Sequence, residues 1–490
     1  MMIVCFHDIV IFYFTAFELI RNVKKVFCLI ILIASGCHNF KEHSGKIITE
    51  DEIAKSLLLD PALIRHAGLT TRESVKKFYA LRDFSLLWTD SSGIIPAVDS
   101  MMNIIRHAKR YGLIPEDYHL YELDNLLNDS VSGDKVSRMD VLLTDSYLTL
   151  RHHIKHGRLD PKNFQPIDIS TKVDDEAIAS LENIRNVSIR MELNLQEPQV
   201  EQYQLMKRAL EVFLFSDKSD SIQLQRSLGI SLNMERWRWE KPLPDRYVSV
   251  NIPAFVLRVV EYDSVLLQSK VIVGKRETPT PVLESVIRSF IIYPYWHVPH
   301  SISTKEILPA LQADSSYLRK HNFDVLNRQG VVVDLATIQW KSYDAENFPF
   351  ILRQREGSEN SMGIIKFNFA NNYGVYLHDT NSKRLFSRKM RDLSHGCIRV
   401  HQAVDFAHYL VREDDIYVSP EDLDQYLSLQ QRLKIELRKP IPVKLQYFTC
   451  EVEKGVIQFY DDIYKKDSLM IQALYRTNTP VGLAHQKPSL

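Results

Sequence analysis

A cysteine and two histidines stand close together in the second half of the chain. His378 lies in the run from Tyr376 to Thr380, and fifteen residues separate this histidine from residues 394–400, which read Ser-His-Gly-Cys-Ile-Arg-Val. A thiol attacks a carbonyl as its thiolate, and a neighbouring imidazole can take the proton. These residue types predict acyl transfer, with Cys397 as the nucleophile and His378 or His395 as the proton acceptor.

Gly396 and Arg399 add two features to this cluster. Gly396 can adopt a positive φ, which would allow a sharp turn that presents the sulfur and leaves nearby backbone N–H groups free to bind an oxyanion. If a strand begins at Cys397, alternation places Arg399 on the same face as the sulfur and sends Ile398 and Val400 to the core. A guanidinium beside the nucleophile suits a substrate that bears a carboxylate.

The two cysteines beyond residue 37 are expected to differ in reactivity. With an imidazole and a guanidinium nearby, the pKa of Cys397 should lie below the roughly 8.5 of a free cysteine. Cys450 follows the apolar residues Tyr447 and Phe448 and is predicted to lie in the core. Cys397 should therefore be alkylated faster than Cys450.

Three regions with different residue patterns must position this cluster. Apolar residues recur at helical spacing in residues 50–240, which predicts a mostly helical scaffold domain. Residues 245–420 contain segments rich in β-branched residues, which predicts a mostly antiparallel β-sheet catalytic domain with short helices. Residues 421–490 are predicted to add a helix and strands that pack on the catalytic domain. The predicted fold class is α+β.

Individual segments give more specific expectations. Predicted helices and strands include Met101–Leu113, Leu120–Leu127, Tyr147–His156, Thr304–Leu311, His401–Val411, Tyr247–Ile252, Val331–Asp334 and Tyr373–His378. His152, His153 and His156 have a spacing seen in metal sites, but no cysteine or acidic cluster completes it. We therefore expect a solvated helix face at these histidines, and no metal site.

The N-terminus has the pattern of a targeting segment. Basic residues around Lys24 precede an apolar run from Val26 to Ala34, and small residues lead to Cys37. Residues 1–37 resemble a bacterial lipoprotein signal, which implies lipidation at Cys37 and a periplasmic, membrane-anchored protein. An uncleaved signal anchor is the alternative.

Composition excludes several classes of protein. The chain has 490 residues, 45% of them hydrophobic, so there is enough apolar material for folded domains. Lys+Arg and Asp+Glu are both 61, so the formal net charge is zero. Because nucleic-acid-binding proteins normally show a basic excess, nucleic acid is not an expected partner.

The Ser-His-Gly-Cys run with its upstream histidine resembles the catalytic motif of the L,D-transpeptidase (YkuD) family. The wider chain resembles the large L,D-transpeptidases of Gram-negative bacteria, which carry an N-terminal helical scaffold domain. The supporting blocks are Asn233–Trp239, Val250–Pro253, Val271–Lys275, Pro294–Pro299, Tyr376–Thr380 and Ser394–Val400. Two departures stand out: the peptidoglycan-binding module usual in these enzymes is missing, and the loop before His378 lacks prolines.

The resemblance implies a mechanism. Cys397 would attack the third residue of a peptidoglycan stem tetrapeptide and release D-Ala, and a diamino-acid amine would take the acyl group to give a 3-3 cross-link. His378 would be the base, its second nitrogen donating to the backbone carbonyl of Asp379. His395, Gly396 and Asp379 would shape the oxyanion site. Substrate contacts would come from Tyr376, Ser394 and Arg399. The chemistry requires no metal or organic cofactor.

Other activities remain open from the sequence. The same site could act as an L,D-carboxypeptidase, or as a lipoprotein–peptidoglycan ligase or hydrolase. An NlpC-type cysteine peptidase is disfavoured because its cysteine precedes its histidine, whereas His378 precedes Cys397 here. A non-catalytic wall-binding protein would not need both residues.

Overall fold

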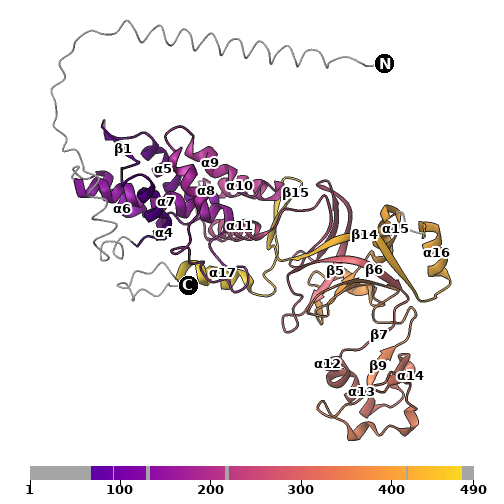
Figure 1. Cartoon of the computed structure of the whole chain (residues 1–490). Helices are drawn as coiled ribbons and strands as arrows, with labels where there is room; N and C mark the ends of the chain where they lie inside the picture. Colours follow the sequence, from indigo (N-terminus) through magenta and orange to yellow (C-terminus); the bar gives the residue numbers. More distant parts are fainter. Residues whose placement is uncertain (1–67, 92, 129–132, 216–219, 415–417, 477–490) are drawn as a thin grey trace, which may run out of the picture. The chain divides into compact units, whose positions relative to one another are not determined.

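The computed structural model describes residues 68–91, 93–128, 133–215, 220–414 and 418–476 (Figure 1). The predicted targeting segment 1–37, with Cys37, lies outside these residues. Within the described part of the chain, none of the helices combines the length and the apolar character needed to cross a bilayer.

The first region is a bundle of helices, as its apolar spacing predicts. Its main elements are α4 (Arg72–Leu81), α5 (Ala97–Arg106), α6 (Leu120–Asn128), α7 (Gly133–His156), α8 (Asp175–Glu182), α9 (Ile189–Leu195), α10 (Glu201–Leu214) and α11 (Ser221–Trp239). Buried carboxylates on α7 hold the loops: Asp145 accepts from Thr71 N at 2.7 Å, and Asp140 accepts from Trp88 N at 2.7 Å. Such bonds satisfy backbone donors inside the bundle.

The expectation that the α7 histidines lie on a solvated face is wrong for His153. Its side chain is buried, and Nδ1 lies 3.1 Å from the Tyr118 hydroxyl. Burial lowers the pKa of His153 well below its usual value. A core role therefore explains this residue.

The second region is built on a nine-stranded sheet. Its strands are β3 (Arg246–Asn251), β4 (Val256–Glu261), β5 (Ser264–Gly274), β6 (Leu283–Ile292), β10 (Ile365–Phe369), β11 (Leu377–His378), β12 (Asp392–Ser394), β13 (Ile398–Val400) and β14 (Leu433–Gln446). The order is β12-β5-β13-β11-β10-β6-β14-β3-β4, and β4 also pairs with β5, so the sheet closes on itself. The sheet is mixed: the β12–β5, β11–β13 and β14–β3 pairs are parallel.

The core of this region lies on one face of the site strands. Ile365, Phe367 and Phe369 on β10 are buried, as are Leu377 on β11 and Ile398 on β13. Helix α15 (Ala403–Asp414) contributes Phe406 and Leu410 to the same cluster. The alternating residues of these strands therefore point to the opposite face, where chemistry is possible.

Between β6 and β10 the chain forms a small group of elements with its own core (Figure 1). We call residues 296–354 the insert. It contains β7 (Trp296–His297), α12 (His300–Ile302), η4 (Ser303–Ile307), α13 (Leu308–Ala313), α14 (Tyr317–Lys320), β8 (Phe323–Leu326) and β9 (Ile351–Gln354). The expected strand Val331–Asp334 is wrong: only Val332 forms an isolated bridge, to Leu326.

The C-terminal region packs on the catalytic domain, as expected, and also on the helical region. Helix α16 (Pro420–Ser428) contacts α15, and β14 is an integral strand of the sheet, paired with β3 and β6. The hairpin β15 (Cys450–Glu453) and β16 (Val456–Phe459) pairs with Arg258 on β4 through Glu451, and the hairpin and helix α17 (Lys466–Arg476) also contact α10 and α11. Apolar side chains on α10 and α11 pack against the apolar side chains of the hairpin.

Asn233 and Trp237 join α11 to the C-terminal hairpin. Asn233 donates to Thr449 Oγ1 at 2.8 Å and accepts from Thr449 N at 2.9 Å. The Trp237 ring stacks on Phe448 at 4.6 Å. Trp237 is thus a packing anchor between the helical and sheet regions.

Candidate active site

The strand alternation expected around Cys397 is confirmed. Cys397 immediately precedes β13, Ile398 and Val400 are buried in the core, and Arg399 lies half-buried on the opposite face. In the parallel pairing of β11 with β13, His378 lies directly opposite Arg399. The sheet register therefore brings His378, Cys397 and Arg399 together from segments nearly twenty residues apart.

His378 is a buried, neutral imidazole. Burial and then the nearby Arg399 lower its pKa to about 3, against a weaker raising effect of the backbone at Asp379 and Met362. Nδ1 is buried and has no hydrogen-bond partner of ordinary geometry. The bond expected from the second nitrogen to the Asp379 carbonyl falls short of ordinary hydrogen-bond geometry, but the Asp379 backbone is close enough to raise the pKa of the ring. Its neutral ring can accept a proton.

The pKa of Cys397 is higher than the sequence suggests. Burial raises it, and this outweighs hydrogen bonding from Tyr376 and the charges of Lys366 and Arg399, which lower it. The thiol lies 4.0 Å from the Gly374 carbonyl oxygen. The expectation of a depressed pKa is thus wrong for the free protein, because desolvation of the sulfur dominates. The resting pair is a thiol and a neutral imidazole.

The loop before Cys397 has the turn predicted at Gly396, whose φ is +111°. Its hydrogen bonds differ from the expectation in one respect: Gly396 N donates to Ser394 Oγ at 3.1 Å and so is not free. Ser394 in turn donates to the Cys397 carbonyl at 2.6 Å. The Ser394 hydroxyl thus accepts one hydrogen bond and donates another within the loop, so Ser394 holds the loop in position. In the described residues, the N–H groups of His395 and Cys397 have no protein acceptor and could serve an oxyanion.

Thr280, which sequence reasoning missed, holds this loop from outside. Its hydroxyl donates to the Gly396 carbonyl at 2.8 Å and accepts from Gly274 N at 2.9 Å. Tyr464 reaches the same place, donating to the Gly274 carbonyl at 2.6 Å. The bonds join residues up to 190 apart in the chain, so no local pattern in the sequence could show them.

Thr280→Val should weaken both the fold and the site. The substitution keeps the shape but leaves the Gly396 carbonyl and Gly274 N–H without their partner, which should cost about 1–3 kcal/mol of unfolding free energy. Alkylation of Cys397 should slow as the loop loosens. Chemical denaturation and labelling kinetics measure the two effects. Thr280→Ser, which keeps the hydroxyl, should retain wild-type stability and wild-type alkylation. Thr337→Val removes an exposed hydroxyl and should change neither the stability nor the alkylation rate. If Thr280→Val and Thr337→Val behaved equally, the role of Thr280 in holding the loop would be contradicted.

The side chains of His395 and Asp379 have partners other than the nucleophile. His395 Nε2 is 2.5 Å from Glu306 Oε1 on η4, so this histidine connects the loop to the insert. The buried Asp379 carboxylate accepts from Ile364 N at 3.0 Å and pairs with Lys383. His395 is thereby available to shape the site, whereas Asp379 fixes the neighbouring turn.

Glu306→Gln should loosen the contact between insert and loop with little effect on global stability. The pair is exposed, and exposed ion pairs contribute about 0–1 kcal/mol. We expect up to about fivefold faster amide hydrogen exchange at residues 303–307 and 394–397. Glu346→Gln, an exposed change elsewhere in the insert, is the control. Unchanged exchange in both segments would show that the bond does not hold the insert.

Tyr376 and Lys366 complete the face around the sulfur. The Tyr376 ring lies 5.5 Å from the His378 ring, and Lys366 Nζ lies 4.0 Å above the Tyr376 ring centre. Burial raises the pKa of Tyr376, and the neighbouring thiol raises it further. Tyr376 was predicted here; Lys366 was missed, although its place between buried Ile365 and Phe367 on a strand was a signal.

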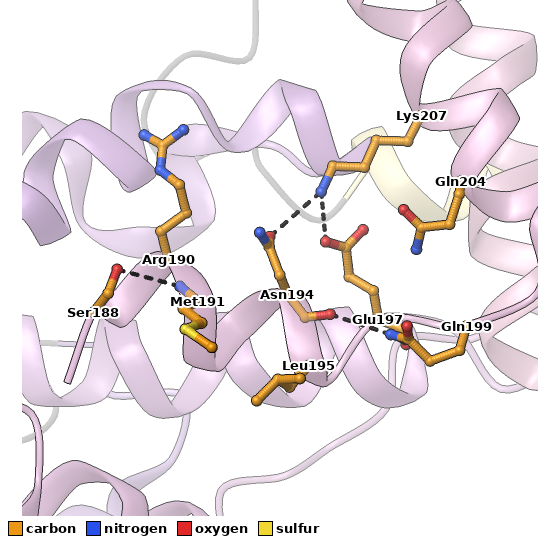
Figure 2. Close-up of a pocket in the computed structure, with 9 residues that line it drawn as sticks. All are labelled: Ser188, Arg190, Met191, Asn194, Leu195, Glu197, Gln199, Gln204 and Lys207. Atoms are coloured by element: carbon orange, nitrogen blue, oxygen red, sulfur yellow. Dashed lines mark hydrogen bonds and ion pairs between the residues drawn. The ribbon is translucent and has the colours of Figure 1, made fainter. Parts of the chain in front are cut away.

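A separate hollow of about 410 Å³ lies in the helical region (Figure 2). Its lining comes from α9, α10 and the loop between them, and none of it from the sheet. Lys207 bridges Asn194, at 3.5 Å, and Glu197 across the hollow, as Figure 2 shows. Lys207 and Glu197 form an ion pair, and Arg190 donates to Asn103 outside the lining. This hollow therefore has no link to the thiol chemistry.

Comparison with known proteins identifies both regions. Residues 73–210 match the Scaffold domain family, and residues 245–418 match the YkuD family, an L,D-transpeptidase catalytic domain. A curated Haemophilus influenzae protein named "Putative L,D-transpeptidase" is 28% identical over 422 residues, covering 84% of this chain and 82% of that protein.

Solved structures with likeness to the chain include two L,D-transpeptidases. One is the catalytic domain of the E. faecium enzyme acylated by ertapenem. It is 13% identical, the match covers 42% of this chain and 100% of that chain, and the TM-score is 0.19. The other is the Mycobacterium smegmatis enzyme, which is 14% identical; the match covers 41% of this chain and 58% of that chain, with a TM-score of 0.18. The assignment rests on the family models and the curated relative: the chain carries an L,D-transpeptidase (YkuD) catalytic domain at residues 245–418, with a Scaffold domain at residues 73–210 ahead of it.

Proposed function

We propose that the chain is a cysteine L,D-transpeptidase that forms 3-3 cross-links between peptidoglycan stem peptides. The observation that carries the proposal is the strand register, which sets the buried, neutral His378 opposite Arg399, two residues after Cys397. The family supplies the substrate class, and the residues supply the chemistry.

In the first half-reaction, the Cys397 sulfur bonds to the carbonyl carbon of the third stem residue. The thiol proton passes to His378, and the free N–H groups of His395 and Cys397 bind the oxyanion; losing one such donor typically costs on the order of 10²–10³ in rate. The bond to D-Ala breaks, and the departing amine takes the proton from His378. A thioester on Cys397 remains.

In the second half-reaction, the side-chain amine of a diamino acid on another stem attacks this thioester. The new amide bond forms, the amine proton passes to His378, and the Cys397 thiol is restored. Water as the acceptor would give a carboxypeptidase. The insert reaches the loop before Cys397 through the exposed pair of Glu306 and His395.

Mass analysis of stem-peptide products tests the proposal. Purified protein incubated with a disaccharide tetrapeptide should give the dimer that has lost one D-Ala. Cys397→Ser should give no dimer. If wild type yields only the tripeptide, the activity is that of a carboxypeptidase, and if it yields neither product, the transpeptidase proposal fails.

We also propose that the mature protein is a periplasmic lipoprotein anchored through Cys37. The support is the signal-like pattern of residues 1–37. Cys37→Ala should release the protein from membranes or block its processing, as fractionation and N-terminal mass analysis would show. An unmodified N-terminus upstream of Val26 on the native protein would contradict the anchor.

A further inference from the structure

Two positive charges without a counterion stand on either side of His378. Lys366 is its cross-strand partner on β10, and Arg399 is its partner on β13. Directly paired residues on neighbouring strands share a face, so the three side chains form one row. Lys366 and Arg399 are both half-buried. Among the described residues, neither has an ion-pair or hydrogen-bond partner.

Both positive charges act electrostatically on the sulfur of Cys397. The Lys366 ammonium lies 4.0 Å above the Tyr376 ring, and its charge, like that of Arg399, lowers the pKa of Cys397. From the insert, His297 is near enough for Lys366 to lower the pKa of its imidazole. The face around the thiol is therefore cationic, and no carboxylate of the described residues neutralises it.

Half-buried charges without a partner are costly, because they lose water and gain no counterion. Burial lowers the pKa of both Lys366 and Arg399, which shows this cost. A methionine on β10 would pack equally well without it. The arrangement is accounted for if the missing anion comes with the ligand.

We propose that Lys366 and Arg399 form an anion clamp that holds a carboxylate of the peptide donor beside the Cys397 thiol. The identity of the donor rests on the proposed function. Arg399 provides a planar fork and Lys366 a mobile point charge, so together they can grip one carboxylate from two sides. Its source is either the terminal carboxylate of the departing residue or the side-chain carboxylate of the diamino acid.

A pair of small alkylating reagents tests the clamp without any turnover. Iodoacetate carries a carboxylate and iodoacetamide does not, and the same thiolate attacks the iodomethyl carbon of each and expels iodide. Because a changed thiol pKa alters both rates equally, the ratio of their rate constants isolates the attraction for the carboxylate. In the wild type, the ratio at Cys397 should exceed that of free cysteine by about tenfold or more, the lower range for a charge-assisted hydrogen bond.

Lys366→Met should lower this ratio by about tenfold, and Lys366→Arg should keep it. The matched control is Lys434→Met: Lys434 belongs to the same row of the sheet, two strands away on β14, and pairs with Glu436. It should leave the ratio unchanged. A wild-type ratio equal to that of free cysteine, or a ratio that falls only in Arg399→Gln, would overturn the clamp.

Two amidated donors identify the carboxylate. One tetrapeptide carries an amide at its C-terminus, and the other carries an amide on the diamino acid. The donor that lacks the clamped carboxylate should lose about 10- to 100-fold in kcat/KM, and Lys366→Met should remove that difference. Equal rates for all donors would overturn the clamp. Absence of any turnover together with a high iodoacetate ratio would refute the proposed function and leave the clamp standing.

Discussion

Cys397→Ala should abolish acylation of this protein by a carbapenem. The drug presents a strained acyl carbonyl beside a carboxylate; the Cys397 thiol can open the ring, and Arg399 can hold the carboxylate. Intact-mass spectrometry should show one adduct per wild-type chain and none on the variant. Because loss of a nucleophile removes the bond-forming group itself, the rate should fall by about 10⁴-fold or more.

The second thiol provides the control for this experiment. Cys450, the first residue of the C-terminal hairpin, is fully buried against α11, and burial raises the pKa of its thiol well above the usual value. Cys450→Ala should therefore be acylated as the wild type is. A wild-type protein that stays unmodified after long exposure, with Cys397 still titratable, would contradict a working transpeptidase centre.

The sequence was sufficient for those parts of the site that depend on local pattern. Cys397 and His378 stand in runs whose chemistry is readable from residue types alone. The side of the sheet on which Arg399 lies follows from the period of a strand, because Ile398 and Val400 must reach the core. The positive φ of Gly396 follows from the need for a sharp turn before the sulfur.

The parts that were missed depend on contacts between distant segments. Thr280 and Tyr464 hold the loop before Cys397, but nothing near them in sequence points to that loop. Lys366 joins the site through the register of β10 on β11. The raised pKa of Cys397 depends on burial, which only the assembled sheet produces.

His378→Ala should slow carbapenem acylation by about 10²–10⁴-fold, the usual contribution of a general base. The thiol has a raised pKa, so little thiolate exists at neutral pH without a proton acceptor. Stopped-flow fluorescence or timed intact-mass spectra would measure the rate. Retained acylation at the wild-type rate would show that another group, such as His395, takes the proton.

The pH dependence of kcat/KM, which reports on the free enzyme, distinguishes a neutral base from a resting imidazolium–thiolate pair. The groups facing His378 are Lys366, Arg399, Cys397 and Tyr376. Burial and Arg399 lower the pKa of His378 to about 3, so the imidazole stays neutral until the pH falls close to that value. The acid limb should therefore lie well below pH ~6.5, the value for an unperturbed histidine.

Removing a positive charge from the row formed by Lys366, His378 and Arg399 should shift the acid limb of the kcat/KM profile. Without the ammonium of Lys366, the charged form of His378 is less disfavoured, so its pKa rises and the acid limb of Lys366→Met shifts to higher pH. Lys434→Met should leave the limb in place. A bound carboxylate would act in the same sense as the methionine, making His378 more basic once the donor is present. A wild-type limb near pH ~6.5 would contradict this account, since it would mean that burial and Arg399 do not lower the pKa of His378 below that of an unperturbed histidine.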